Sequence, residues 1–373
     1  MIRMGARIEK ASDYCTFCPK LCRFACPVAQ AEARETVTPW GLMSLLHMVR
    51  HGNVELDSEV GEAFFHCTGC LRCQTFCKHE NDVADAMLAS RRLLVDRGVA
   101  IPRVLQGIDL NYEQFGAPHG AVPPLPDGVA EAFDPRANVA YVPEATRRAN
   151  APDTLASVGR VLEVALGRKV ALVEDIDGQP LHDSGELLRW TGHGAWSEMW
   201  QDHLVKSLED RTLIITESAG FAERWLRATT EPRVVHLAAL LIENAAPLAE
   251  AARKAATRPL AERTVVYHDA CGVGRRLDLY NSPRILVEAL LGRPAEDLWL
   301  NRAESVCCGA AGAYPTIEPE GAKRAAQVLA DAVHEHGADV VITAEQGCQY
   351  HMMASTGIAV LDLVELAAVA IGA

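Results

Sequence analysis

Eight of the chain's twelve cysteines stand close together near its N-terminus, in two groups of four. The first group is Cys15, Cys18, Cys22 and Cys26, and the second is Cys67, Cys70, Cys73 and Cys77. Three thiolates on one short loop can reach three corners of a four-iron, four-sulfur cluster, and the fourth corner needs a ligand from elsewhere. The spacing therefore predicts two [4Fe-4S] clusters within the first 77 residues.

The two groups differ slightly in spacing. The second is a regular C-x2-C-x2-C-x3-C run, whereas the first has one additional residue before Cys22. In the first group a proline, Pro27, directly follows the last cysteine, and the second group has no proline at that position. Where two clusters share such runs, the fourth cysteine of each run serves the other cluster. We therefore expect one cluster on Cys15, Cys18, Cys22 and Cys77, and the other on Cys67, Cys70, Cys73 and Cys26. The alternative is two zinc sites of four cysteines each, but zinc sites usually pair two C-x-x-C knuckles.

The remaining four cysteines lie far along the chain, at Cys271, Cys307, Cys308 and Cys348. Adjacent cysteines in a strand would point to opposite faces, but on a loop both could face a metal. Cys271 follows an expected strand at 263–268, and Cys348 follows another at 339–343. The carboxyl ends of parallel strands are where α/β folds place their sites. The four thiols are thus predicted to hold a third iron–sulfur cluster or a zinc ion.

Several residues near these cysteines have two interpretations each. His268 and Asp269 could tune the metal or carry protons, or they could be structural; the same choice holds for His351 and, more weakly, His193. Glu345 could be an oxygen ligand or a surface carboxylate.

Other chemistry fits these residues less well. Arg275 and Arg276 could face an anion, but solvated charges at a helix start are the simpler interpretation. A Cys271–His268 nucleophile leaves Cys307 and Cys308 without a role. Gly272-Val273-Gly274 lacks the third glycine of a dinucleotide loop.

The elements that position these cysteines fall into three parts. Residues 1–100 form a small helical module, with one helix starting at Thr38 and Pro39 and another after Asn81. Residues 101–151 are rich in proline and are expected to be an extended linker, followed by a helix over 152–166. Beyond it, strands alternate with helices, which predicts parallel α/β units. The expected strands are 169–174, 211–216, 232–236, 263–268, 339–343 and 358–362.

An internal repeat indicates that the α/β part consists of two related lobes, 152–250 and 251–373. Residues 211–225 align without a gap to 338–352, which places Phe221 opposite Cys348. Residues 170–178 resemble 264–272, and 191–194 (TGHG) fall opposite 307–310 (CCGA). The fold class is therefore α+β multidomain: a helical, ferredoxin-like di-cluster module followed by two α/β lobes, of which the first has no cysteine.

These motifs resemble the CCG (cysteine-rich) domain iron–sulfur proteins. That group includes iron–sulfur subunits of anaerobic glycerol-3-phosphate dehydrogenase, of glycolate oxidase and of lactate-utilisation systems, and heterodisulfide reductase subunits. The matching segments are 267–290, 306–314 and 337–352, together with the N-terminal di-cluster module. The sequence departs from the family's final C-x-x-C, because Glu345 replaces its first cysteine. The resemblance implies two CCG-type lobes, of which only the second retains its ligands.

Composition and charge restrict the class of partner. Lys and Arg number 36 against 49 Asp and Glu, a net charge of −13, which disfavours nucleic acid and anionic membranes as direct partners. No apolar run is long enough to span a membrane, and the N-terminus does not resemble a signal peptide. Clustered cysteines without an export signal indicate a cytoplasmic protein, which could associate with a membrane through a partner.

These observations predict an electron-transfer subunit of an oxidoreductase complex, not a complete enzyme. Electrons would enter from a flavin-containing dehydrogenase partner and leave toward a quinone or another carrier. The alternative is a catalytic, heterodisulfide-reductase-like subunit that uses the CCG site on a disulfide or thiol. A third interpretation makes the CCG site a structural zinc site.

Overall fold

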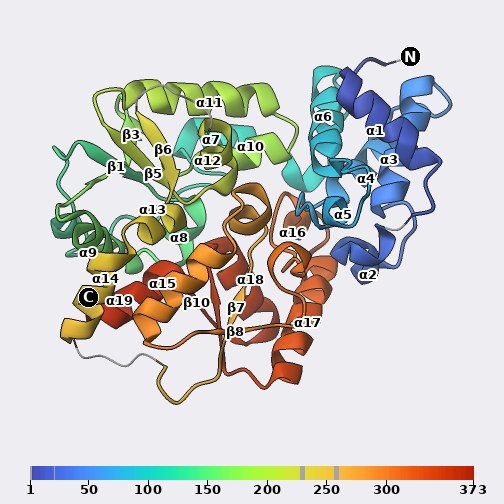
Figure 1. Cartoon of the computed structure of the whole chain (residues 1–373). Helices are drawn as coiled ribbons and strands as arrows, with labels where there is room; N and C mark the ends of the chain where they lie inside the picture. The colour runs from blue at the N-terminus through green and yellow to red at the C-terminus, as the bar shows by residue number, and fades with distance from the viewer. Residues whose placement is uncertain (1, 21, 227–231, 256–259) are drawn as a thin grey trace.

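The N-terminal module is helical, as expected from the sequence. The computed structural model describes residues 2–20, 22–226, 232–255 and 260–373. The module's helices are α1 (Ala6–Thr16), η1 (Arg23–Ala25), α2 (Pro27–Glu32), α3 (Pro39–His51), α4 (Ser58–Ala63), η2 (Phe64–His66), α5 (Arg72–Thr75) and α6 (Val83–Asp96). The Thr38 hydroxyl accepts a hydrogen bond from the Gly41 amide at 2.9 Å and caps α3, and Asp82 caps α6. Both predicted helices are therefore confirmed. Figure 1 shows the module as a separate blue body beside two sheet-containing lobes.

The first lobe contains a parallel four-stranded sheet in the order β2-β1-β5-β6. The segment leading to it holds η3 (Arg103–Leu105), α7 (Ile108–Phe115) and η4 (Ala130–Ala132). The lobe itself contains β1 (Val139–Val142), α8 (Ala145–Asn150), α9 (Thr154–Leu166), β2 (Ala171–Leu172), β3 (Asp175–Ile176), β4 (Gln179–Pro180), α10 (Glu186–Trp190), α11 (Gly194–Ser207), β5 (Leu213–Thr216), α12 (Ala219–Trp225), β6 (Arg233–His236), α13 (Leu237–Glu243) and α14 (Ala245–Ala255). Strand β1 lies inside the stretch 101–151 that was expected to be a linker, and it is fully buried between β2 and β5.

The second lobe contains a parallel sheet of the same topology, β8-β7-β9-β10. Its elements are β7 (Val265–His268), the π-helical turn η5 (Gly272–Arg276), α15 (Asn281–Leu291), β8 (Glu296–Asp297), η6 (Arg302–Glu304), α16 (Tyr314–Ile317), α17 (Pro319–His336), β9 (Val340–Thr343), α18 (Gln346–Thr356), β10 (Ala359–Asp362) and α19 (Leu363–Ile371). Each of the six strands expected from the sequence is present, as β2, β5, β6, β7, β9 and β10. Strand β8 lacks a strand pattern because its two residues, Glu296 and Asp297, are acidic, and β1 follows a proline-rich stretch that obscures it.

The strand order corrects part of the predicted repeat. In the first sheet β1 lies between the short edge strand β2 and the central strand β5, and in the second sheet β7 lies between the short edge strand β8 and the central strand β9. Strand β1 therefore corresponds to β7, and β2 corresponds to β8. The alignment of 170–178 with 264–272 is therefore wrong, and Tyr141 in β1 is the counterpart of Tyr267 in β7. The ungapped pairing of 211–225 with 338–352 agrees with the structure, because β5 and β9 hold equivalent central places. Descent by duplication stays a prediction.

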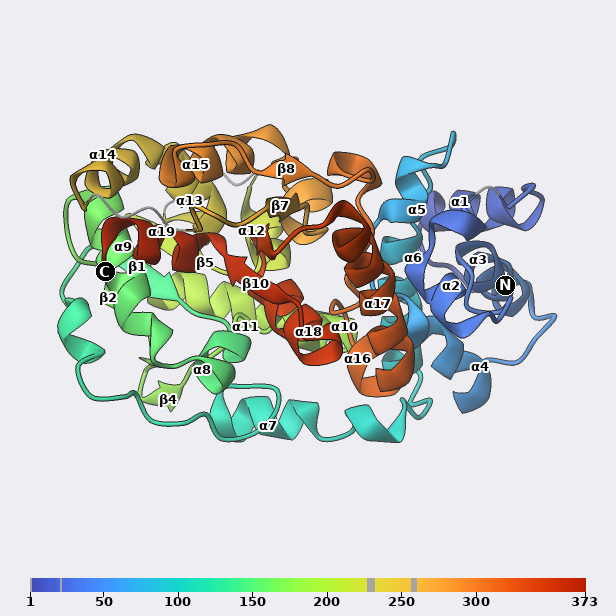
Figure 2. The same cartoon turned by 90° about the horizontal axis from the view of Figure 1, so that it is seen from below.

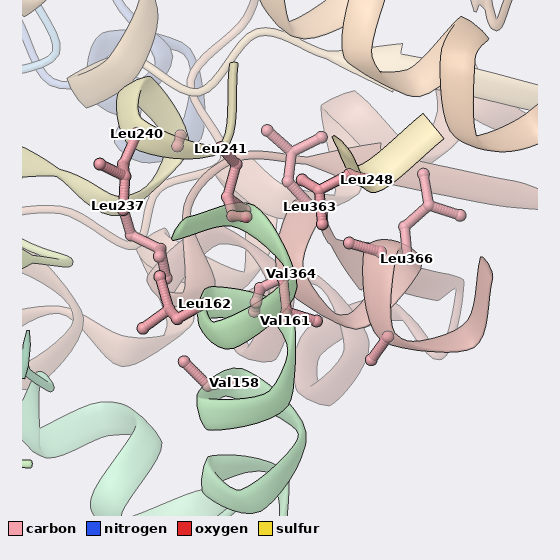
Figure 3. Packing of buried hydrophobic residues seen from close by; sticks show 14 of the residues in the cluster. Val158, Val161, Leu162, Leu237, Leu240, Leu241, Leu248, Leu363, Val364 and Leu366 are labelled. Atoms are coloured by element: carbon pink, nitrogen blue, oxygen red, sulfur yellow. The ribbon is translucent and has the colours of Figure 1, made fainter. Parts of the chain in front are cut away.

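The two lobes share one apolar core. Helices α9, α13, α14, α15 and α19 lie between the sheets, and Figure 2 shows them together at the end of the molecule away from the N-terminal module. Figure 3 shows the side chains that meet there, among them Leu162 of α9, Leu241 of α13 and Leu363 of α19. Burial of large aliphatic side chains stabilises such a contact by about 1.5–3 kcal/mol each. The boundary drawn at 250 and 251 therefore divides one continuous core, and the domain limits stay a prediction.

Asp362 and Glu365 interrupt the apolar C-terminal segment for a structural reason. They form a capping box at the start of α19, in which each side chain reaches the other residue's backbone amide. Most residues of α19 are buried, so α19 is a helix of the core and not an amphipathic helix on the surface. Within the described ranges, no helix combines the length and apolarity needed to cross a membrane.

Candidate iron–sulfur and metal centres

The first predicted ligand set gathers at the end of α1. Cys15 is in the last turn of α1, and its Sγ accepts a hydrogen bond from Asn81 Nδ2 at 3.2 Å. Burial raises the pKa of Cys15 to about 12, and the neighbouring thiolates of Cys22, Cys77 and Cys18 add to that rise. Cys77 is therefore near the first group, as crossed ligation requires. Thiolates crowded in this way need a cation among them.

The second predicted set lines one small cavity. Cys26, Cys67, Cys70 and Cys73 all face that cavity, which Val28, Leu42 and Val83 close on its apolar sides. Burial raises the pKa of Cys73 well above its ordinary value, and the charges of Cys70, Cys67 and Cys26 raise it further. Four soft sulfur donors in an apolar enclosure suit an iron–sulfur cluster or zinc and no hard cation. The ligation itself stays a prediction for both sets.

The four distal cysteines converge at the carboxyl end of the second sheet, as the sequence predicted. His268 ends β7 opposite Thr343, which ends β9, so the loops that follow these two strands start side by side. Cys308 Sγ lies 2.8 Å from Cys348 Sγ, and Cys307 and Cys308 are almost fully buried. Hydrogen bonds from the Cys307 and Cys348 thiols lower the pKa of Cys308 well below its ordinary value. A thiol of this kind is readily available as a metal ligand.

His268 belongs to the same site. It is 1% exposed, and its ligand atom, Cys308 Sγ and Cys348 Sγ all lie within 4.8 Å of one another. Its Nδ1 is 3.5 Å from Ser305 Oγ, whereas its Nε2 is buried and has no hydrogen-bond partner among the described residues. An unpartnered ring nitrogen beside two thiols fits a metal ligand, with Ser305 orienting the ring. Sequence reasoning left the role of His268 open because strand-end histidines are as often structural.

The other polar candidates near the distal cysteines have structural contacts. Asp269 is buried, and Arg284 holds both of its oxygens at 2.7 Å. His351 Nε2 contacts the Ala322 carbonyl oxygen at 3.1 Å, and His193 precedes α11 and packs its ring against Trp196. Glu345 is not a surface carboxylate, one of the two interpretations from the sequence, because its side chain is 21% exposed and lines a pocket between the two lobes. Burial raises the pKa of Glu345 well above its ordinary value.

Arg275 and Arg276 are not solvated charges, which corrects the expectation from the sequence. Arg275 Nε donates to the Cys70 carbonyl at 2.5 Å, and Arg276 Nη2 donates to the Gly69 carbonyl at 3.0 Å. Both arginines thus bind the backbone of the second N-terminal cysteine loop. Cys307 Sγ also lies 3.9 Å from Thr68 Oγ1 in that loop. The N-terminal module and the distal cysteines therefore meet directly.

Among its described residues, the first lobe has no equivalent metal site. After β2 the chain reaches Asp183, Ser184 and Gly185, which occupy the place of Cys307, Cys308 and Gly309; both glycines have positive φ. The expected counterpart, 191–194, is therefore wrong, because it follows α10. Asp183 accepts hydrogen bonds from the Tyr112 hydroxyl at 2.6 Å and from the Gly185 amide at 2.8 Å. Phe221, opposite Cys348, is fully buried in the core of the first lobe. Hydrogen bonds and apolar packing thus replace metal binding.

A pocket of about 350 Å³ lies between the two lobes at the carboxyl ends of their strands. Cys271 and Cys348 line it on one side, and Glu144 and Glu186 line it on the other. Four lining residues have a buried side-chain atom without a hydrogen-bond partner among the described residues: Glu144, Glu186, Glu345 and Gln346. Burial raises the pKa of Glu144 well above its ordinary value, and Asp183 raises it further. Unpaired buried polar groups of this kind are satisfied by water or by a bound molecule.

Comparison with known proteins agrees with the two kinds of cysteine site. Residues 11–81 match the 4Fe-4S dicluster domain, and residues 265–353 match the cysteine-rich (CCG) domain. This chain therefore contains a 4Fe-4S dicluster domain and a cysteine-rich (CCG) domain.

Among curated proteins, the chain is similar to a subunit of the dihydromethanophenazine:CoB–CoM heterodisulfide reductase of Methanosarcina barkeri. The two are 24% identical over 330 residues, which cover 82% of this chain and 77% of that protein. It is also 24% identical over 281 residues to the probable iron–sulfur-binding oxidoreductase FadF of Bacillus subtilis, covering 70% of this chain but only 39% of FadF. An uncharacterized iron–sulfur protein of Methanococcus maripaludis is 32% identical over 89 residues, 24% of this chain and 17% of that protein.

Proposed function

We propose that this chain is the electron-transfer subunit of an oxidoreductase complex, with two [4Fe-4S] clusters in its N-terminal module and a third metal centre at the CCG site. The observation that carries this is the direct contact between the Cys67–Cys73 loop and the Cys307–Cys308 loop. Iron–sulfur clusters move single electrons, and redox centres exchange electrons most readily when they lie close together. A flavin-containing dehydrogenase would supply the electrons, and a quinone or another carrier would accept them.

Metal analysis of anaerobically purified protein tests the proposal. Two four-iron clusters give about eight iron atoms per chain, and a third gives about twelve. Cys307→Ser should lower the iron content by about four if the CCG site holds a cluster, or remove one zinc if it holds zinc. The matched control is Met353→Leu, on the exposed side of α18, which should change neither. Fewer than about eight iron atoms in fully loaded wild-type protein would contradict the proposal.

A second candidate function is catalytic reduction of a disulfide at the CCG site. The pocket beside Cys271 and Cys348 favours it, because small-molecule sites are concave and have a few converging polar groups. A disulfide would take two electrons and two protons to give two thiols, with reduced methyl viologen as the electron source in an assay. Turnover by wild-type protein that Gln346→Ala abolishes, at unchanged iron content, would support this candidate. The missing second ligand set in the first lobe argues against it.

A further inference from the structure

Arg275 has a place in the fold that neither its neighbours in sequence nor the proposed function explains. Arg275 belongs to η5, the turn that starts directly after Cys271, and its guanidinium lies between the N-terminal module and the second lobe. Nε donates to the Cys70 carbonyl at 2.5 Å, and Nη1 donates to the carbonyls of Ala303 and Ser305, each at 3.0 Å. One side chain therefore joins the backbone at Cys70 to the backbone of the segment before Cys307, and Arg275 itself is 205 residues from Cys70 along the chain.

Two more contacts reinforce this junction. Arg276 Nη2 donates to the Gly69 carbonyl at 3.0 Å, while its Nη1 pairs with Glu223 at 2.9 Å. In the opposite direction, Arg72 of the N-terminal module donates from Nε to the Glu304 carbonyl at 2.9 Å. The planar guanidinium fork suits such multiple carbonyl contacts, whereas a lysine can form them only as a point donor.

The remaining guanidinium nitrogen of Arg275, Nη2, indicates what this side chain can bind. Nη2 is buried and has no hydrogen-bond partner among the described residues. Burial lowers the pKa of Arg275, but the side chains of Cys70, Cys271 and Cys307 raise it above its ordinary value. Nη2 is therefore available to an acceptor on a group bound at these cysteines. Hydrogen bonds to sulfur and nearby positive charge are two ways in which a protein sets the potential of an iron–sulfur centre.

We propose that Arg275 is a positioning residue that holds the Cys70 and Cys307 loops together and places its positive charge and its unpartnered Nη2 beside a metal centre bound there. This inference rests on the proposed function, because it requires metal centres on these cysteines. The positive guanidinium stabilises the more negative, reduced form of a centre at its side. Removal of the charge should therefore lower the reduction potential, and removal of the fork should loosen the junction.

The test compares Arg275→Gln and Arg275→Lys with wild-type full-length protein after cluster loading. The matched control is Arg324→Gln. Arg324 also joins the second lobe to the module through a carbonyl, that of Ala31, but it is exposed and pairs with Glu318 instead of with the loops of Cys70 and Cys307. Iron content is measured first, and an EPR-monitored redox titration follows. At fixed potential, Arg275→Gln should shift the ratio of oxidised to reduced centre about tenfold toward oxidised, which is about 59 mV for one electron. Arg324→Gln should leave the ratio unchanged.

Arg275→Lys separates charge from positioning. It keeps the positive charge, so its potential should stay closer to wild type, but it cannot reach three carbonyls. Hydrogen exchange of the amides in 68–70 and 303–306 should therefore become about tenfold faster. Unchanged exchange in this variant, or an unchanged potential in Arg275→Gln, overturns the inference. If wild-type protein itself fails to hold iron, the proposed function fails instead, and if Arg275→Gln alone does not fold, the exchange rates in Arg275→Lys decide.

Discussion

Arg147 provides a sharp test of how the two lobes are held together. It is 1% exposed, and its Nε and Nη2 atoms each lie 2.6 Å from a carboxylate oxygen, of Glu217 after β5 and of Asp362 at the end of β10. Its Nη1 donates to Thr154 Oγ1 at 3.1 Å. Although burial disfavours the charge, Glu217 and Asp362 raise the pKa of Arg147 well above its ordinary value. A single cation thus connects the first sheet to the second.

We expect Arg147→Met to lower the free energy of unfolding by about 3–5 kcal/mol. Methionine fills a similar volume, so the loss comes mainly from two buried carboxylates that are left without a cation. Urea denaturation at pH 7, followed by tryptophan fluorescence, measures the change. The matched control is Arg160→Met on α9. The Arg160 side chain is exposed and donates to Ser157, so this change should alter stability by less than about 0.5 kcal/mol.

A compensated variant separates the charge effect from packing. Arg147→Met combined with Glu217→Gln and Asp362→Asn removes the unpaired charges and should recover most of the lost stability. If Arg147→Met loses less than about 1 kcal/mol, the ion network does not hold the lobes together. If the triple variant is no more stable than the single one, the loss is one of packing and the electrostatic reasoning is wrong.

Three further changes test the fold and the sites. Phe221→Ala should cost about 3–5 kcal/mol in urea denaturation, because the ring is fully buried; a loss below about 1 kcal/mol would mean that the first lobe's core repacks freely. Gly69→Ala should reduce bound iron, because Gly69 has a φ of +69° and an added Cβ would lie 1.9 Å from the Trp190 ring; unchanged iron would show that the cysteine loop can shift. Burial lowers the pKa of His236 to about 4 from 6.5, so the unfolded chain binds more protons between those pH values. Stability should therefore fall by up to about 3 kcal/mol as the pH drops from 6.5 to 4, and His236→Asn should flatten this slope in urea titrations.

The sequence by itself determined the sites whose ligands depend on local spacing. The two N-terminal cysteine groups, the Cys-Cys-Gly loop and the alternation of strand and helix are all patterns within short segments. The helix cap at Thr38 was found from residue type alone, because a cap is a contact between residues three apart.

Only the tertiary structure decided how these sites meet. Strand order places β1 between β2 and β5, and the sequence of short strands does not specify that order. The same order identifies Asp183 and Ser184 as the counterparts of Cys307 and Cys308. The approach of Arg275 to Cys70 and of His268 to Cys308 brings together residues far apart in the chain. Such contacts result from packing of whole elements against a shared core, and no local pattern of residues specifies them.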